Sequence, residues 1–221
     1  MTEARARHAA APAIAGRYVA LVPLDAAAHG GPLYEGSHGD GRERIWRYLW
    51  DGPFDTRGEF DAVLREKAAA ADRRYLAIVD RATGAALGHA AYMREEPAHR
   101  VIEVGDVLYT TALQRTPGGT EAMYLMARHV FEGLRYRRYE WKCNALNEPS
   151  RAAALRLGFV FEGIFRQHMI IKGQNRDTAW FSMLDIEWPA HKAAFERWLA
   201  PENFDRDGRQ RHRLAELRDS V

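Results

Sequence analysis

The spacing of apolar and polar positions divides this chain into segments with a period of two and segments with a period near 3.6. Alternation with β-branched or aromatic side chains predicts strands, here at 17–24, 75–80, 86–93, 100–109, 139–144, 164–171 and 178–186. Apolar positions three and four apart predict helices, here at 25–34, 42–50, 57–71, 121–134, 148–157 and 189–199. This order of strands and helices, without an internal repeat, predicts one mixed α/β domain.

Capping residues and glycines predict where several of these helices and turns lie. Asp25 is a cap for the first helix, and Gly36–Gly41 is expected to end it. Asp55 or Thr56 caps the helix at 57–71, with Phe60, Val63 and Leu64 facing inward, and Gly158 stops the helix at 148–157. The last two strands form a hairpin around 173–175.

Composition limits the class of protein. A chain of 221 residues with 47% hydrophobic and 28% charged residues is expected to fold as a globular protein. No apolar run approaches the ~18 residues that cross a bilayer, and a single cysteine, Cys143, fits a reducing cytoplasm. The net charge of +2 excludes a charge-driven nucleic-acid partner. Residues 1–15 are expected to be a disordered leader, and 201–221 a peripheral polar tail or helix.

Several common functional motifs are absent from the sequence. The nine histidines never fall at the short spacings of helical or finger-type metal sites, so no metal is expected. The sequence also lacks a serine-hydrolase elbow, a Walker loop and a dinucleotide fingerprint.

The segment 113–120, Leu-Gln-Arg-Thr-Pro-Gly-Gly-Thr, follows a predicted strand and precedes a predicted helix. The first N–H groups of a helix have no intrahelical partner, and they lie at the positive end of its dipole. Thr116 can cap, Pro117 suits the first helical position, and Gly118 and Gly119 let an anion approach the main chain. The segment predicts either an anion cradle or an ordinary strand-to-helix turn.

Three segments together resemble the GNAT acyl-CoA N-acyltransferases, and within them the RimJ/RimL ribosomal-protein N-terminal acetyltransferases. They are 101–120, the run from Asn147-Glu-Pro-Ser150 to Leu157-Gly158-Phe159, and 162–166 followed by 175–178. The resemblance covers roughly residues 17–188. It implies an α/β (α+β) fold with a single mixed, mostly antiparallel, splayed sheet flanked by helices, and an acetyltransferase domain at 16–200.

The resemblance also implies acetyl-CoA as the donor. Its diphosphate would bind at the cradle, and its pantetheine arm between the strands 101–109 and 139–144, where Asn147 can both cap a helix and bond the arm. The implied cofactor-binding residues are Val107, Leu108, Tyr109, Gln114, Arg115, Thr116, Gly118, Gly119, Thr120, Asn147 and Ser150.

The sequence departs from the family pattern at two positions. Pro117 stands where the family's loop has its first glycine, so one backbone donor is lost. Ala154 stands where many relatives carry the tyrosine that protonates the leaving thiolate. Ser150, as in the ribosomal-protein branch, is the substitute acid; its alternative is a hydrogen-bonding role at the helix start.

Glu103 and Asp106 are the candidate bases, because an amine must be neutral to attack. Glu103 has the spacing of the strand glutamate that serves as base in several relatives; alternatively it lies on a solvated strand face. A bulge at Gly105 would bring Asp106 to the same side, where the two acids would attract a cationic amine and raise each other's pKa.

Other residues are weaker candidates. Tyr109 and His168 could line the acceptor pocket or belong to the core or rim, and Cys143 is expected to pack rather than react. Asn175 is expected to be a turn residue, with Asp177 either a turn residue or an acceptor or dimer contact. An aromatic cluster is expected to pack the early helices over the sheet, where relatives form the acceptor wall: Trp46, Tyr48, Trp50 and Phe54.

These observations lead to one function and two alternatives. The chain is interpreted as a cytoplasmic N-acetyltransferase that moves acetyl directly to a primary amine. A homodimer is one possible assembly. The leading acceptor is a peptide or protein α-amine. The alternatives are a small amine (a polyamine, amino sugar or amino-acid-like antibiotic) and a CoA-binding module without turnover.

Overall fold

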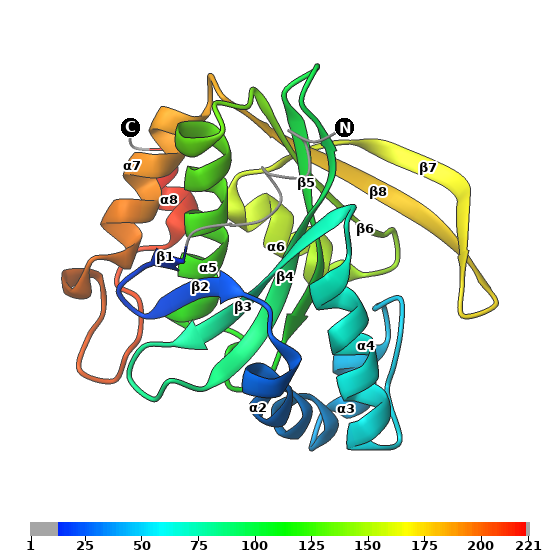
Figure 1. Cartoon of the computed structure of the whole chain (residues 1–221). Coiled ribbons are helices and arrows are strands. Elements are labelled where there is room, and N and C mark those ends of the chain that lie inside the picture. The colour runs from blue at the N-terminus through cyan, green and yellow to red at the C-terminus, as the bar shows by residue number, and fades with distance from the viewer. Residues whose placement is uncertain (1–12, 220–221) are drawn as a thin grey trace. The chain divides into compact units, whose positions relative to one another are not determined.

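The computed structural model describes residues 13–219, which contain eight strands. They are β1 (Ile14–Ala15), β2 (Val19–Pro23), β3 (Arg73–Asp80), β4 (Ala86–Glu96), β5 (Val101–Tyr109), β6 (Arg138–Asn144), β7 (Val160–Ile171) and β8 (Gln174–Leu184). They form one mostly antiparallel open sheet in the order β1-β2-β3-β4-β5-β6-β8-β7, seen in Figure 1. The predicted fold class is therefore confirmed.

The helices match most of the predicted helical segments. They are α2 (Ala26–His38), α3 (Arg42–Trp46), α4 (Arg57–Ala69), α5 (Pro117–Arg128), α6 (Glu148–Leu157), α7 (Trp188–Leu199) and α8 (Leu214–Arg218). A π-helical turn, η1 (His129–Gly133), follows α5, and a 3-10 turn, η2 (Pro201–Asn203), follows α7. No helix within residues 13–219 is long and apolar enough to cross a bilayer.

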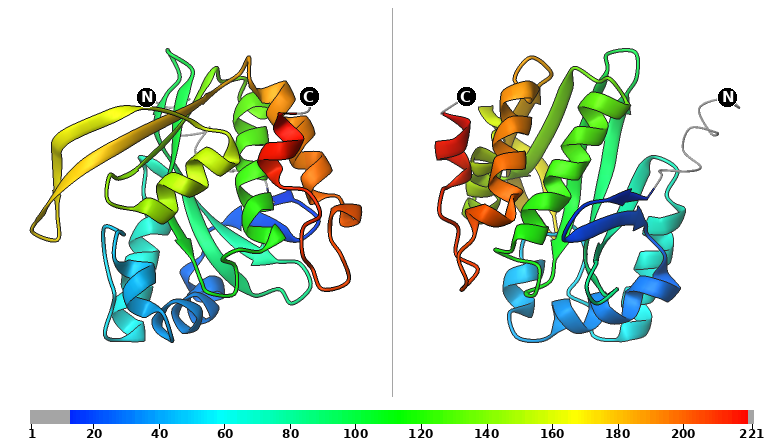
Figure 2. Two further views of the ribbon diagram at one scale, coloured as in Figure 1. Left: turned by 180° about the vertical axis from the view of Figure 1, so that it is seen from behind. Right: turned by 90° about the vertical axis from the view of Figure 1, so that its left-hand side faces the viewer.

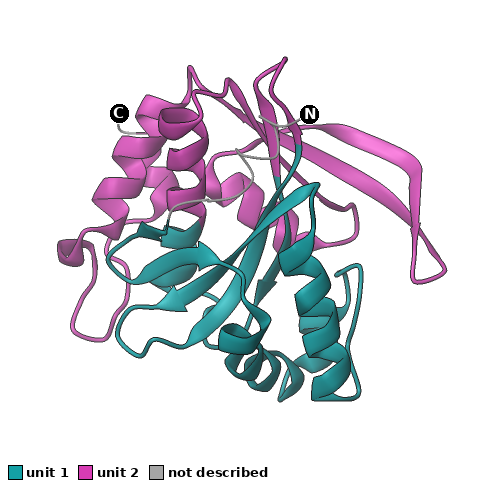
Figure 3. Cartoon of the chain, viewed as in Figure 1, with its two compact units in different colours: residues 1–94, 104–122 teal, residues 95–103, 123–221 magenta. Residues whose placement is uncertain are grey.

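The chain divides into two units, coloured separately in Figure 3. Unit 1 holds residues 1–94 and 104–122, and unit 2 holds residues 95–103 and 123–221. The boundary passes through β5 and α5, so each of these elements contributes residues to both units.

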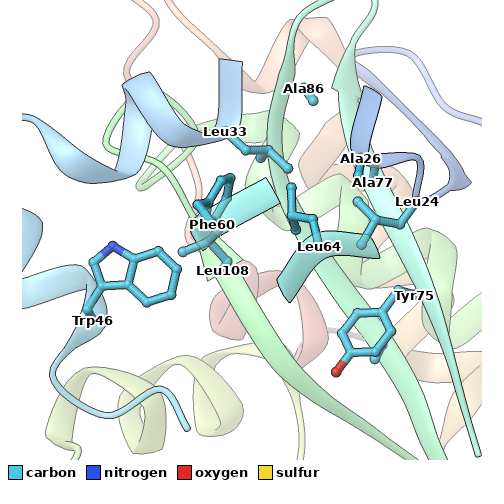
Figure 4. Close-up of a cluster of buried hydrophobic side chains, with 11 residues drawn as sticks. Leu24, Ala26, Leu33, Trp46, Phe60, Leu64, Tyr75, Ala77, Ala86 and Leu108 are labelled. Atoms are coloured by element: carbon cyan, nitrogen blue, oxygen red, sulfur yellow. The ribbon is translucent and has the colours of Figure 1, made fainter. Parts of the chain in front are cut away.

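The sheet part of unit 1 contains a hairpin formed by β3 and β4. β3 and β4 pair antiparallel, with Leu76 opposite Ala90, and the Asp80 carboxylate fixes the turn by accepting the N–H of Thr83 at 2.8 Å. β2 pairs with the other edge of β3. Figure 4 shows the core of this unit, where side chains from α2, α3 and α4 meet those of β3, β4 and β5. Its largest members are Leu24, Leu33, Trp46, Phe60, Leu64, Tyr75 and Leu108.

Two helices of unit 1 differ in length from the prediction. Asp25 caps α2 as expected, but the helix continues past Tyr34 to His38. Gly36 does not break it, because this glycine permits close packing: a Cβ there would lie 2.6 Å from the Thr110 Cγ2. α3 ends at Trp46, whose buried indole donates to the Ser37 carbonyl at 3.0 Å.

The buried carboxylate of Glu121 joins residues 17–19 to α5 within unit 1. Glu121 is 4% exposed and accepts the backbone N–H groups of Arg17, Tyr18 and Val19 at 2.7, 2.6 and 2.9 Å. Just before them, Ile14–Ala15 pairs with β2 as β1, so the predicted disordered leader does not extend through residue 15. The rest of that leader, residues 1–12, lies outside the described residues.

Unit 2 is built on β6, β8 and β7. β8 pairs antiparallel with both neighbours, and Figure 2 shows the long β7–β8 hairpin. Its turn is formed by Lys172 and Gly173, one residue earlier than predicted, so Asn175 belongs to β8 and not to the turn. In the same figure α7 and α8 lie side by side, and Leu214 and Leu217 of α8 are buried.

Candidate active site

The turn between β5 and α5, in unit 1, contains the predicted anion cradle. Thr116 caps the helix: its Oγ1 accepts the Gly119 N–H at 3.1 Å, and its carbonyl accepts the Thr120 N–H at 3.4 Å. The N–H groups of Arg115 and Gly118 have no acceptor among the described residues. The donors left for an anion are therefore fewer than the sequence suggested, and they lie at a helix N-terminus.

The two glycines of this turn serve packing. A Cβ on Gly119 would lie 2.8 Å from the Leu113 carbonyl oxygen, and one on Gly118 would lie 3.0 Å from the Val19 Cγ1. Both positions face the interior of unit 1. The expectation that their missing side chains give an anion access to the main chain is corrected accordingly.

Tyr109 and Gln114 brace the cradle. The Tyr109 hydroxyl donates to the Gly119 carbonyl at 2.7 Å, and the Gln114 Nε2 donates to the Tyr109 carbonyl at 2.9 Å. The side chain of Leu108 is fully buried in the core, so this residue can meet a ligand only through its main chain. Val107 beside it is half-buried.

Arg115 supplies the positive side chain of the cradle. It is exposed, and its backbone has a left-handed φ of 60°. Free N–H groups, a helix N-terminus and a guanidinium are the donors that a diphosphate needs. The residues of this turn therefore fit the diphosphate that the resemblance implies.

Asp106, also in unit 1, is held by a lysine. Its buried carboxylate is ion-paired with Lys67 and accepts the Tyr75 hydroxyl at 2.6 Å, while Lys67 also contacts Asp51 at 3.1 Å. Asp106 has a left-handed φ of 46°, so the backbone irregularity predicted at Gly105 lies one residue later.

The pKa of Asp106 is lowered, not raised as predicted. Burial alone would raise it, but the charge of Lys67, a contribution from His89 and the hydrogen bonds from Lys67 and Tyr75 outweigh burial. A carboxyl with a low pKa is a weak base. The cluster also includes His89, whose pKa burial and the Lys67 charge lower to about 4, so this imidazole is neutral near pH 7.

Glu103 lies in unit 2 and is buried, at 4% exposure, which rules out a solvated strand face. The Lys142 ammonium contacts Glu103 at 3.0 Å and Glu140 at 2.8 Å, and it lies 3.6 Å from the centre of the Trp180 ring. Arg138 bonds Glu140 and Glu162 in turn. Three carboxylates, of Glu103, Glu140 and Glu162, thus lie beside two cations in this cluster.

Ser150 and Asn147 lie at the start of α6, also in unit 2. The Asn147 Oδ1 accepts the Ser150 N–H at 3.1 Å, which makes Asn147 the predicted cap. Its side-chain NH₂ has no acceptor among the described residues and remains available to a ligand. The Ser150 Oγ accepts the Trp141 indole N–H at 3.0 Å.

The weaker candidates have structural partners. The Asp177 carboxylate accepts the Gln167 N–H at 2.8 Å and the Asn175 side chain at 2.9 Å, fixing an irregularity in β7. His168 shares a hydrogen bond of 2.9 Å with the Thr178 hydroxyl. Cys143 is buried.

The aromatic cluster packs as predicted at Trp46 and Phe54, whose ring centroids are 5.4 Å apart.

Sequence reasoning missed Lys67, Lys142 and Trp141. Trp141 carried a signal, because it lies two positions before Cys143 on a strand and so shares its face. Neither lysine carried a signal toward its predicted acid. Asp106 is 39 positions from Lys67. Glu103 lies on another strand from Lys142, although Lys142 also contacts Glu140 of its own strand.

A comparison with protein families decides the assignment. Residues 20–160 match the family model described as "Acetyltransferase (GNAT) domain". The chain belongs to the GNAT family. It is therefore an acyltransferase enzyme, and GNAT domains use acetyl-CoA as their acyl donor.

Solved structures of GNAT proteins agree. The chain is similar to a GCN5-related N-acetyltransferase from Brucella melitensis, with 48% identity, a TM-score of 0.92 and coverage of 94% of each chain. A GNAT-family protein from Chromobacterium violaceum ATCC 12472 is 43% identical, with a TM-score of 0.76, over 81% of this chain and 90% of that one.

The similarity to a named ribosomal N-acetyltransferase extends over a shorter segment. YdaF of Bacillus subtilis (strain 168), provisionally named a ribosomal N-acetyltransferase, is 33% identical over 73 residues. That match covers 33% of this chain and 40% of the relative, so the chain spans well under half of that protein's length.

Proposed function

We propose that this GNAT enzyme transfers acetyl from acetyl-CoA directly to the α-amine of a peptide or protein. The observation that carries the cofactor assignment is the pair of unused N–H groups, of Arg115 and Gly118, at the N-terminus of α5. The remaining cradle residues Gln114, Thr116, Gly119 and Thr120 hold this turn in shape. Asn147 offers its NH₂ to the pantetheine arm.

Glu103 and Ser150 divide the proton transfers. Acetyl-CoA supplies an activated acyl group whose sulfur leaves. Glu103, which stands at the spacing of the family's strand glutamate and is buried beside Lys142, takes a proton from the amine, and Ser150 gives its proton to the departing sulfur. Asp106 accepts from both Lys67 and Tyr75 and has a lowered pKa, so we assign it the role of holding Lys67 and the β5 backbone in place.

The choice of a peptide or protein α-amine as acceptor is supported by fewer observations than the choice of acetyl-CoA as donor. The resemblance to the ribosomal-protein branch favours an α-amine, and the name of YdaF, a ribosomal N-acetyltransferase, favours a protein acceptor. The proposal also includes a cytoplasmic location, favoured by the single cysteine, and a homodimer, favoured by the resemblance.

The test is an assay of CoA release with separate acceptor panels, followed by mass spectrometry of the products. One panel holds peptides with free α-amines, matched to the same peptides with blocked N-termini, and the other holds polyamines, amino sugars and amino acids. Acetylation of free but not blocked peptides is expected. Turnover only with small amines would overturn the acceptor class, and CoA binding without turnover on any panel would overturn the catalytic assignment.

A further inference from the structure

Trp141 and Ser150 are joined by a hydrogen bond whose direction is fixed. The Trp141 indole N–H lies 3.0 Å from the Ser150 Oγ. An indole can only donate, so the serine oxygen accepts here. Trp141 is 7% exposed and its ring packs against Phe159, with centroids 5.7 Å apart. Packing therefore holds this donor in position.

This bond means that the Ser150 hydroxyl proton does not point at the indole. A hydroxyl has one proton and two lone pairs, and the indole occupies one lone pair. The Ser150 backbone cannot shift freely, because its N–H is held by Asn147. The serine oxygen thus accepts from the indole, and its proton remains available to a ligand.

We propose that Trp141 is a positioning residue that fixes the Ser150 hydroxyl as a proton donor to the leaving sulfur. This inference rests on the proposed function, in which Ser150 is the acid. As the amine nitrogen bonds the acetyl carbon and the carbon–sulfur bond breaks, Glu103 takes a proton from nitrogen and Ser150 gives its proton to sulfur. Solvent then returns a proton to Ser150 and removes the one on Glu103.

The physical benefit is the stabilisation of charge on the serine oxygen. When Ser150 loses its proton, the indole N–H bonds a negatively charged oxygen, and such a bond is about twice as strong as a neutral one. The oxygen also lies in the first turn of α6, at the positive end of the helix dipole. Both effects make Ser150 a stronger acid during the reaction.

The test is a double-mutant cycle with a matched control. Trp141→Phe keeps an aromatic ring and removes the N–H, and it is made alone and together with Ser150→Ala. The control is Trp198→Phe, because Trp198 is also buried in unit 2 and donates to the Gln210 Oε1 at 2.8 Å. Values of kcat and of KM for acetyl-CoA are measured for each, with circular dichroism as the check on folding.

The proposal predicts a specific pattern of kcat and KM values among these variants. Ser150→Ala lowers kcat about 100-fold, in the range of a lost general acid. Trp141→Phe alone lowers kcat about tenfold with KM nearly unchanged, but it has almost no further effect in the Ser150→Ala background, because it acts through that hydroxyl. Trp198→Phe leaves kcat close to that of the unmodified enzyme. If Trp141→Phe does not fold, Trp141→Leu, which is also apolar and has no donor, carries the same cycle.

Two different failures can be told apart. An equal loss from Trp141→Phe in both backgrounds, or no loss beside an impaired Ser150→Ala, overturns the role of Trp141 and leaves Ser150 as the acid. Unchanged turnover in Ser150→Ala overturns the acid assigned in the proposed function, and the role of Trp141 with it.

Discussion

Lys67 and Asp106 form an ion pair inside unit 1, although 39 positions separate them in the sequence. Their side chains are 10% and 2% exposed, so both charges are largely removed from water. The pair ties the last turn of α4 to β5. Because a buried charge is costly without its partner, each residue depends on the other.

Replacing Lys67 by Met is expected to lower the free energy of unfolding by about 3–5 kcal/mol, since it leaves Asp106 charged and buried. Arg57→Met is the control on the same helix, where the Arg57–Asp61 pair is 42% and 23% exposed. That change is expected to cost about 0.3–0.5 kcal/mol. Urea unfolding measures both, and similar losses would contradict the importance of the buried pair.

Acid should weaken the fold through Asp106. Its pKa lies below the ordinary 3.8, so near and below pH 3.8 the unfolded chain binds more protons than the folded one. The stability from the ion pair is therefore present above pH 3.8 and lost as the pH falls through the folded pKa. Asp106→Asn should show a flatter dependence in urea unfolding from pH 5 to 2. A slope equal to that of the unmodified protein would refute this.

His89 should add a separate pH dependence. Its pKa falls from 6.5 to about 4 on folding, chiefly through burial. Between these values the unfolded histidine takes up a proton and the folded one does not, so stability decreases as the pH falls, by roughly 3 kcal/mol in all. His89→Gln should remove this decrease, whereas the exposed His212→Gln should keep it. Equal curves for the two variants would count against the assignment.

Arg115 should govern affinity for CoA. Arg115→Glu places a negative charge beside the proposed diphosphate site and is expected to raise the dissociation constant at least about tenfold. Arg115→Gly removes the charge but suits the φ of 60°, so its effect should be smaller. Isothermal titration calorimetry with CoA measures both. Unchanged affinity in Arg115→Glu would exclude this turn as the diphosphate site.

Cys143 should be chemically inert in the folded enzyme. Burial raises the pKa of its thiol, and a protonated thiol is a poor nucleophile. Iodoacetamide at pH 7.5 should modify it at least about tenfold more slowly in native protein than in urea, as followed by intact mass. Rapid modification of the native enzyme would show that the thiol is accessible and ionised.

Elements with strong local signals could be predicted from the sequence. α6 has the predicted bounds because Asn147 caps it and Gly158 ends it with a φ of 100°. The predicted ends of α2 and α3 were wrong, because tertiary contacts lie where local propensity suggested otherwise. Gly36 of α2 packs against Thr110, and Trp46 at the end of α3 donates to the Ser37 carbonyl. Glycine signals a break, but it serves equally where two backbones must approach closely.

The surroundings of the candidate site residues could be predicted only in part, for a similar reason. Residue types and spacing indicated Glu103, Ser150 and the cradle, because those signals are local or come from the family. The cations beside the acids could not be predicted, and they change the chemistry: Lys67 makes Asp106 a weaker base. A pKa depends on three-dimensional neighbours, which no local pattern encodes.

The clasp of Glu121 on residues 17–19 limits how far the chain can be trimmed for expression or crystallisation. A version that begins at residue 20 would strand a carboxylate in the interior with none of its three amide donors. Shortened versions should therefore begin ahead of Gly16, whose missing side chain makes room for that carboxylate.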